Sequence, residues 1–281
     1  MKDFHIHYHL DECGADEMTM PNIEKACIDL GIDEAAVLKH YSQAMPNGEK
    51  DWVCWHVQGT KELDKFLSEY RGYTPKQVKF HCGVETELLN DKGDINIPIE
   101  DQNKVDIVQL SIHFMIDTQK LPMDMIMFPD TYFCPEYGTE AGKKLWNSWL
   151  ERVNSVGAEY LLEATVNGYY NAIKRFPKIK SLAHMGNGVG HLVRYGADIE
   201  SVPMSRRIEI YEPLIKLMAE NGINWELTSG GMWQELFNVA YKAGVNFTCT
   251  ADGHQLYQGW GPLCKHTEAE EALAKLLANY K

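Results

Sequence analysis

The feature that most constrains the fold of this chain is an alternation of short apolar segments with amphipathic segments along most of its length. The apolar runs 35–40 and 245–251 each follow a stretch with helical periodicity, and Pro21 and Gly31 mark the start and the stop of the first helix. Strands that alternate with helices pair in parallel, because each helix returns the chain to the same edge of the sheet. The sequence therefore predicts an α/β protein with a mainly parallel sheet, and a barrel fits better than a sandwich.

The alternation can be divided into seven strands and seven main helices. The expected strands are 3–9, 35–40, 77–87, 104–113, 179–184, 223–228 and 245–251. The expected helices are 21–31, 60–71, 139–155, 158–175, 206–221, 232–243 and 267–280. A chain of 281 residues with 44% apolar content suits a single barrel domain over residues 1–281.

Composition excludes several functions. A net charge of −13 without a basic stripe argues against a nucleic-acid partner. No run approaches the roughly 20 apolar residues of a membrane span, and the first residues lack the apolar core of a secretion signal, so we expect a soluble cytoplasmic protein. Seven scattered cysteines without a CxxC pair argue against a disulfide framework or a zinc ribbon. The sequence does not specify an oligomeric state.

Three histidines occupy alternate positions in the first expected strand, in the segment HIHYH. Side chains alternate between the faces of a strand, so His5, His7 and His9 would share one side. A purification tag would be a plain histidine run, whereas apolar residues interleave here at the period of a strand. The triplet alone is as compatible with satisfied structural histidines as with a metal site.

Other ionisable residues stand at or just after the ends of later strands. They are His40, Glu85, His113, His184, Asp252 and His254. In an α/β barrel the carboxyl ends of the strands surround one site, so these residues would meet there. A histidine at a strand end is more often structural when it stands alone. The joint pattern points to metal, because imidazole and carboxylate are ligands that zinc, manganese and iron accept.

With these residues in place, the chain resembles the polymerase and histidinol phosphatase (PHP) family of phosphoesterases over nearly its whole length. The first family motif, HxH, is matched by His5-Ile6-His7, and the histidine after the first helix by His40. Gly83-Val84-Glu85 is similar to the GxE motif. Asp252-Gly253-His254 is similar to the closing DxH motif, with single histidines at His113 and His184 between.

The resemblance implies a distorted (β/α)7 TIM-like barrel that holds two or three divalent ions at the carboxyl ends of its strands. Under it, His5, His7, Glu85 and Asp252 would bind one ion, and Glu85 would bridge to a second ion held by His113. The remaining histidines would complete the cluster; they are His40, His184 and His254. Manganese, zinc and iron all remain open.

One position of the family pattern is not matched by this chain. Many members carry a His or Asp about six residues after HxH, and this chain has Cys13 there, with Asp11, Glu12 and Asp16 nearby. Either an acidic residue takes that role, or Cys13 ligates, or the third ion is held weakly. His9 is not required by the pattern, and Glu87 suits support of a ligand. Other histidines match nothing and are expected to be structural or exposed; they are His56, His81 and His266.

The histidinol-phosphatase branch resembles the chain further in GHLVRYGAD and in ELTSGG at 226–231. By this resemblance Arg194 would bind the substrate phosphate, with Arg206 or Arg207 as weaker candidates, although a surface arginine on a helix is the alternative. The inserted MGNGVG leaves open whether His184 or His191 is the metal ligand.

The resulting hypothesis is a metal-dependent phosphomonoesterase acting on a small phosphorylated substrate, with L-histidinol phosphate as the leading named substrate. A metal-bound hydroxide would attack phosphorus, with Asp252 in the reacting cluster, and His254 or His191 would protonate the leaving alkoxide. Two alternatives are weighed against it. One is an amidohydrolase or TatD-type metal-dependent hydrolase, and the other is a PHP module that binds metal without catalysis. Two long loops, 41–59 and 115–138, carry aromatic residues for either substrate stacking or covering of the barrel mouth; they are Trp52, Trp55, Tyr132 and Phe133.

Overall fold

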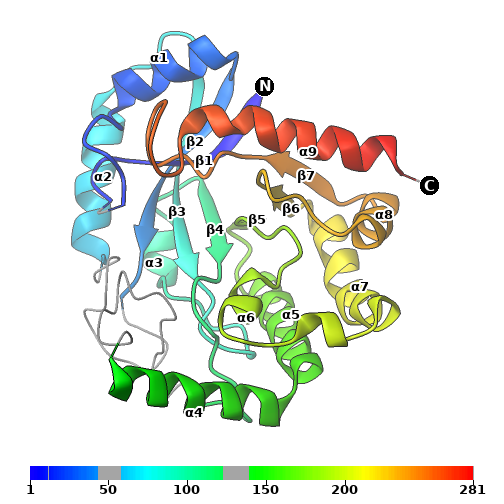
Figure 1. The fold of residues 1–281 in the computed structure, drawn as a ribbon. Coiled ribbons are helices and arrows are strands. Elements are labelled where there is room, and N and C mark those ends of the chain that lie inside the picture. Colours follow the sequence, from blue (N-terminus) through cyan, green and yellow to red (C-terminus); the bar gives the residue numbers. More distant parts are fainter. Residues whose placement is uncertain (12, 44–57, 123–138, 281) are drawn as a thin grey trace.

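The computed structural model describes residues 1–11, 13–43, 58–122 and 139–280 (Figure 1). Within these ranges seven parallel strands form one sheet in the order of the sequence. They are β1 (Lys2–His7), β2 (Glu34–Tyr41), β3 (Lys79–Glu87), β4 (Ile107–Ser111), β5 (Ile179–Leu182), β6 (Asn224–Leu227) and β7 (Asn246–Cys249). This order is what a right-handed winding of strand and helix produces.

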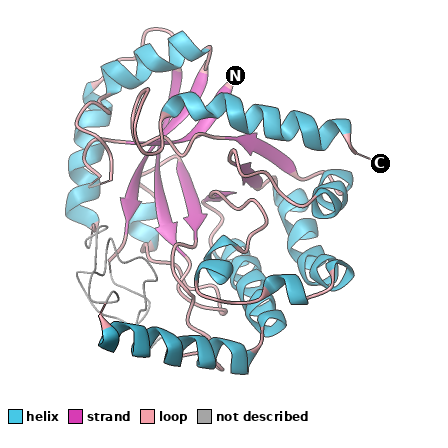
Figure 2. Cartoon of the chain, viewed as in Figure 1, coloured by secondary structure: helices cyan, strands magenta, loops and turns pink. Residues whose placement is uncertain are grey.

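Helices follow the strands and cover the outside of the sheet (Figure 2). They are α1 (Met20–Leu30), α2 (Thr60–Gly72), α3 (Ile99–Gln102), α4 (Glu140–Val156), α5 (Ala158–Arg175), α6 (Gly190–Arg194), α7 (Met204–Asn221), α8 (Gln234–Lys242) and α9 (His266–Ala278), with 3-10 turns η3 (Ile199–Ser201) and η4 (Leu263–Lys265). None of the described helices has the length and apolar character needed to span a membrane.

The first strand also meets the segment after the last strand, which nearly closes the sheet into a barrel. Ile6 and Gly253 form a parallel bridge. The amide of His7 donates to the carbonyl of Gly253 at 2.8 Å, and the amide of Gly253 donates to the carbonyl of His5 at 2.9 Å. The prediction of a distorted (β/α)7 barrel is thereby confirmed.

The alternation of side chains along each strand separates a hydrophobic layer from a polar interior. On β3, Val84 lies in the hydrophobic core, whereas Glu85 reaches histidines of β1 and of the segment after β5. Outside the sheet, Tyr8 packs on Phe66 of α2, with ring centroids 5.4 Å apart. The apolar core therefore holds the helices on the strands, and the strand ends are left to carry polar groups.

The first strand is shorter than the sequence suggested. β1 ends at His7, and the chain turns at once, with the amide of Asp11 donating to the carbonyl of Tyr8 at 2.9 Å. The expectation that three histidines share one face is therefore wrong for His9, whose Nε2 instead lies 3.0 Å from Glu69 of α2. The expected aromatic contacts of Trp52, Trp55, Tyr132 and Phe133, and the positions of Glu12 and His56, fall outside the described residues.

Candidate metal centre

Two histidines and two carboxylates meet at the carboxyl end of β1. His5 Nε2 lies 3.0 Å from His7 Nε2, 3.2 Å from Glu85 Oε2 and 3.3 Å from Asp252 Oδ1. His7 Nε2 lies 3.3 Å from the same Glu85 oxygen and 3.4 Å from the same Asp252 oxygen. The Nε2 atoms of both histidines thus face the same two carboxylate oxygens, and His5 and His7 are fully buried.

The other nitrogen of each ring is occupied by a carboxylate behind it. His5 Nδ1 lies 2.8 Å from Glu226 Oε1, and His7 Nδ1 lies 3.0 Å from Asp11 Oδ2. These contacts favour the tautomers in which Nδ1–H donates and the Nε2 lone pair faces inward. Despite burial, the neighbouring carboxylates raise the pKa of His5 and of His7 in the metal-free protein, so these carboxylates favour positive charge beside them. A divalent ion held by the two Nε2 atoms would supply that charge in place of protons, and the donor set therefore fits such an ion.

Glu85 is the centre of the cluster, because both of its oxygens face histidines. On the side of Oε1, His184 Nε2 lies at 2.9 Å and His113 Nε2 at 3.6 Å. On the side of Oε2, His40 Nδ1 lies at 3.3 Å in addition to the two histidines of β1. A carboxylate in this position can bridge two ions.

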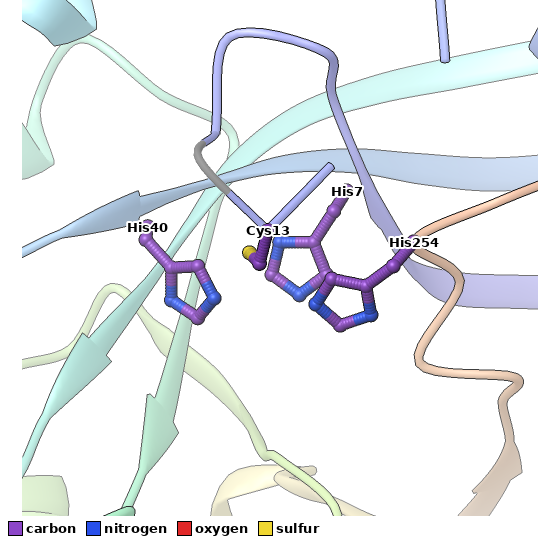
Figure 3. Close-up of side chains that lie close together, drawn as sticks. All are labelled: His7, Cys13, His40 and His254. Carbon is purple, nitrogen blue, oxygen red and sulfur yellow. The ribbon is translucent and has the colours of Figure 1, made fainter. Parts of the chain in front are cut away.

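Within the described part of the chain, the possible ligand atoms form three groups, each with its atoms within 4.8 Å of one another. They are His5, His7 and Glu85; Glu85, His113 and His184; and His7, Cys13, His40 and His254. Seven of the eight residues predicted as metal ligands belong to these groups. The eighth, Asp252, lies beside the first group, with its Oδ1 3.3 Å from His5 Nε2. Figure 3 shows the third group, with the Cys13 sulfur between the rings of His40 and His7.

Three of the residues near the unmatched position are described, Asp11, Cys13 and Asp16, and of these only Cys13 joins a ligand group. Asp11 lies behind the site, where it accepts from His7, from Lys39 Nζ at 2.7 Å and from the amide of His40 at 3.1 Å. Asp16 is exposed. Burial, together with the negative charges of Asp11 and Glu85, raises the pKa of the Cys13 thiol in the metal-free protein.

His184, and not His191, reaches the carboxylate cluster. The amide of His184 donates to Glu226 at 2.8 Å, and its ring contacts Glu85. His191 Nε2 instead lies 3.4 Å from Thr165 Oγ1. Among described residues other than glycine, His184 (φ 32°) and Asp252 (φ 51°) have a left-handed backbone. Such conformations cost about 1–3 kcal/mol and cluster at functional sites.

Glu87 binds His113 with both of its oxygens. It therefore supports a candidate ligand, the role that the sequence analysis favoured for it. One oxygen of Glu87 forms a short hydrogen bond with His113 Nδ1, and the other accepts from the amide of His113 at 3.0 Å. Burial disfavours the charged ring, yet Glu87 and Glu85 raise the pKa of His113 to about 9. In the metal-free protein this ring therefore holds a proton that a cation would displace.

His191 and His254, the two candidate proton donors, have lowered pKa values, in contrast to His113. Burial, with the positive charges of Arg194 and His113 nearby, lowers the pKa of His191 to about 3. Burial, with the charge of His7, lowers the pKa of His254 to about 3. Both rings are neutral at neutral pH, a state that suits a metal ligand or a hydrogen-bonding group better than a general acid.

A cavity of about 190 Å³ opens beside the second ligand group. Its lining includes His113, His184, His191, Arg194 and Tyr169. Arg194, at the end of α6, is exposed, and no carboxylate in the described ranges pairs with its guanidinium. A phosphate oxygen at the metal groups could therefore also reach a free guanidinium.

The weaker arginine candidates lie elsewhere. Arg206 contacts Glu159, Glu163 and Glu209 on the helical surface. Arg207 is buried and pairs with Glu200 at 2.9 Å. Neither arginine lines the cavity that Arg194 borders, and carboxylates pair with both side chains, so their contact with the substrate stays an untested prediction.

The histidines outside the motifs have structural partners. His81 pairs with Glu34 at 2.9 Å, and His266 Nδ1 lies 2.9 Å from Asp3. Asp3, which the sequence analysis missed, also accepts from the amides of His5 at 2.9 Å and Ala251 at 3.0 Å. It thus joins β1, which carries the HxH motif, to the segment after β7 that carries the DxH motif.

The fold of the chain is similar to that of two solved structures. No protein-family model matches the chain, and no curated protein matches its sequence. The crystal structure of histidinol phosphate phosphatase from Lactococcus lactis subsp. lactis Il1403, complexed with zinc, L-histidinol and phosphate, has a TM-score of 0.53 and 14% identity over 100% of this chain and 94% of that chain. A candidate histidinol phosphatase from Listeria monocytogenes has a TM-score of 0.55 and 14% identity over 90% of this chain and 95% of that chain. The chain therefore shares the barrel fold of these two structures.

Proposed function

We propose that the chain is a metal-dependent phosphoesterase of the PHP family that hydrolyses a small phosphomonoester, with L-histidinol phosphate as the first substrate to test. The observation that carries the proposal is the position of Glu85. One carboxylate faces histidines with both oxygens, and three possible ligand groups surround it at the barrel end.

The groups suit divalent cations because of what surrounds them. The rings are oriented by buried carboxylates, Glu226 behind His5 and Asp11 behind His7. Such outer partners raise the basicity of a histidine ligand and hold its lone pair on the ion. Divalent ions bound here would supply an acidified water and would neutralise charge on the phosphoryl oxygens.

The residues beside the ligand groups would bind and orient the substrate. Arg194 can hold two phosphate oxygens with its planar guanidinium. His191, held by Thr165, can exchange a hydrogen bond with the phosphate or with the alcohol portion. The cavity of about 190 Å³ is smaller than the roughly 300–1,000 Å³ of pockets for drug-sized ligands, which favours a small substrate.

The proposed substrate follows from two independent supports. The Lactococcus lactis structure with a similar fold is complexed with zinc, L-histidinol and phosphate. In this chain the run GHLVRYGAD brings His191 and Arg194 to the lining of the same cavity as two possible metal ligands.

The test is phosphate release from a panel of monoesters, including histidinol phosphate, by protein loaded with manganese or zinc. We expect turnover by the wild-type protein, and loss of turnover in Asp252→Asn and His7→Ala together with loss of bound metal. Asp64→Asn is the matched control, because Asp64 is exposed, pairs with Lys104 and lies outside the three ligand groups.

Each outcome separates two readings. Turnover of other monoesters alone would keep the reaction and discard histidinol phosphate. Full metal content with no release from any monoester would overturn the proposal and favour an amidohydrolase or a non-catalytic metal module. His7→Ala with unchanged metal content and turnover would contradict the ligand assignment.

A further inference from the structure

The third ligand group differs from the other two because it contains sulfur. We propose that Cys13 is a thiolate ligand of an additional metal ion, held together with His40 and His254, and that this sulfur makes the position selective for zinc and other thiophilic ions. The inference rests on the proposed function only in assuming that divalent ions occupy the barrel end. It does not depend on which bond the enzyme hydrolyses.

The number of ligands follows from the geometry of His7. His7 belongs by distance to two groups, but its Nε2 already points at Glu85 and Asp252 within 3.4 Å. A neutral imidazole nitrogen has one lone pair and serves one ion. Cys13, His40 and His254 then remain as three protein ligands, and the fourth position is left open for water or substrate, as in catalytic zinc sites.

The two histidines of this site are oriented by neighbouring groups. His254 Nδ1 lies 2.8 Å from the carbonyl oxygen of Asp252, so Nδ1–H donates there and the Nε2 lone pair is available. The amide of His40 donates to both oxygens of Asp11 at 3.1 Å, which fixes the end of β2 against the loop that carries Cys13. Both rings are buried.

The loop between β1 and α1 is built to hold the thiol beside them. The amide of Gly14 donates to the carbonyl of Asp11 at 3.0 Å, and the amide of Ala15 donates to the carbonyl of His254 at 3.0 Å. Glu17 accepts from the amide of Leu256 at 3.1 Å. Cys13 therefore lies in a segment bonded to the same loop as His254, and its place in Figure 3 is not that of an isolated surface cysteine.

The chemistry of the donors sets the preference for the metal. The other two groups offer only imidazole nitrogen and carboxylate oxygen, which manganese, iron and zinc all accept. A thiolate is a softer donor and favours zinc and cadmium over manganese. One barrel end would thus hold two kinds of position, and a mixed metal content is expected when both zinc and manganese are supplied.

The experiment is cobalt substitution followed by absorption spectroscopy on the full chain. Cobalt-loaded wild-type protein should show thiolate-to-cobalt charge transfer in the near ultraviolet, beside the visible absorption of the nitrogen and oxygen positions. Cys13→Ser should lose the charge-transfer absorption and one bound cobalt, and keep the visible absorption. Cys264→Ser is the matched control, because Cys264 is also partly exposed and lies outside all three groups.

Two spectroscopic outcomes would overturn the proposal. The first is charge transfer that persists in Cys13→Ser, and the second is visible absorption without charge transfer in the wild-type protein. A second measurement does not depend on how the variant folds: zinc should protect Cys13 of the wild-type protein from alkylation, read by peptide mass spectrometry, and equal alkylation with and without zinc would contradict ligation. Absence of phosphatase activity would leave both readouts intact.

Discussion

Glu226 offers a sharp test of whether buried carboxylates behind the ligands control the metal centre. It is fully buried on β6 and accepts from His5 Nδ1 and the amide of His184, both at 2.8 Å, and from Gln109 Nε2 at 2.6 Å. It therefore positions residues of two different ligand groups at once. Replacing it separates the contribution of its charge from that of its hydrogen bonds.

The two substitutions have different expected magnitudes. Glu226→Ala leaves three buried donors without an acceptor, and at about 1–3 kcal/mol for each the loss is about 3–9 kcal/mol, comparable to the whole stability of a domain. Glu226→Gln keeps the shape. The Gln109 oxygen has no partner among the described residues, so a flip of its amide lets it accept from the new side chain. The charge is then the main loss.

We expect Glu226→Gln to fold and to bind metal about 10–100-fold more weakly, the usual effect of losing an outer partner of a histidine ligand. The measurement is competition with a chromophoric chelator, with unfolding in urea as the check on stability. Unchanged metal affinity in Glu226→Gln would refute the reasoning. So would a loss of less than about 1 kcal/mol in Glu226→Ala, because unsatisfied buried donors cost more than that.

Three further predictions concern separate parts of the site. Because the pKa of His113 is raised to about 9, metal must displace a proton from this ring below that pH, so metal affinity should rise with pH up to about 9 and then level off. Titration calorimetry in buffers of different ionisation enthalpy measures the released protons, and an affinity that does not change with pH would contradict the prediction. Gly14→Ala places a Cβ 2.5 Å from the carbonyl oxygen of Tyr8, so the cysteine loop should shift and cobalt charge transfer should weaken; an unaltered spectrum would count against the built loop. Arg194→Ala should raise KM for the monoester about 10–100-fold, the value of a charged hydrogen bond, whereas the surface variant Arg175→Ala should leave it unchanged.

Most of the fold could be predicted from the sequence, because helix boundaries and strand periodicity are local features of the residue pattern. Pro21 and Gly31 bound α1 as predicted, and Gly31 adopts a left-handed φ of 74° that favours glycine. The prediction for β1 was wrong at its end, because period-two alternation continues through His9 although the chain has already turned. Alternation alone cannot reveal a turn that is set by contacts to another segment.

The sequence predicted those site residues that are histidines or carboxylates at the ends of strands. The sequence could not decide between His184 and His191 as the metal ligand, because the position of the His184 ring depends on a left-handed backbone that no local residue pattern specifies. The roles of Glu226 and Asp3 were missed because each stands within a strand, and only the barrel brings it to a histidine. Alternation that places a charged residue on the inner face of a strand was the available signal.

The near closure of the barrel has a consequence for how the protein matures. His5 lies on β1 and Asp252 follows β7, so a ribosome must synthesise everything from the first strand to the last before the two residues can share an ion. Contacts of such long range form late and slowly, because the entropy of closing the loop is lost first. Metal uptake in the final geometry therefore follows completion of the fold. Once bound, ions join the first strand to the segment after the last and stabilise the seam by mass action. Chelation should accordingly expose this seam first, as faster amide exchange in β1 than in β3.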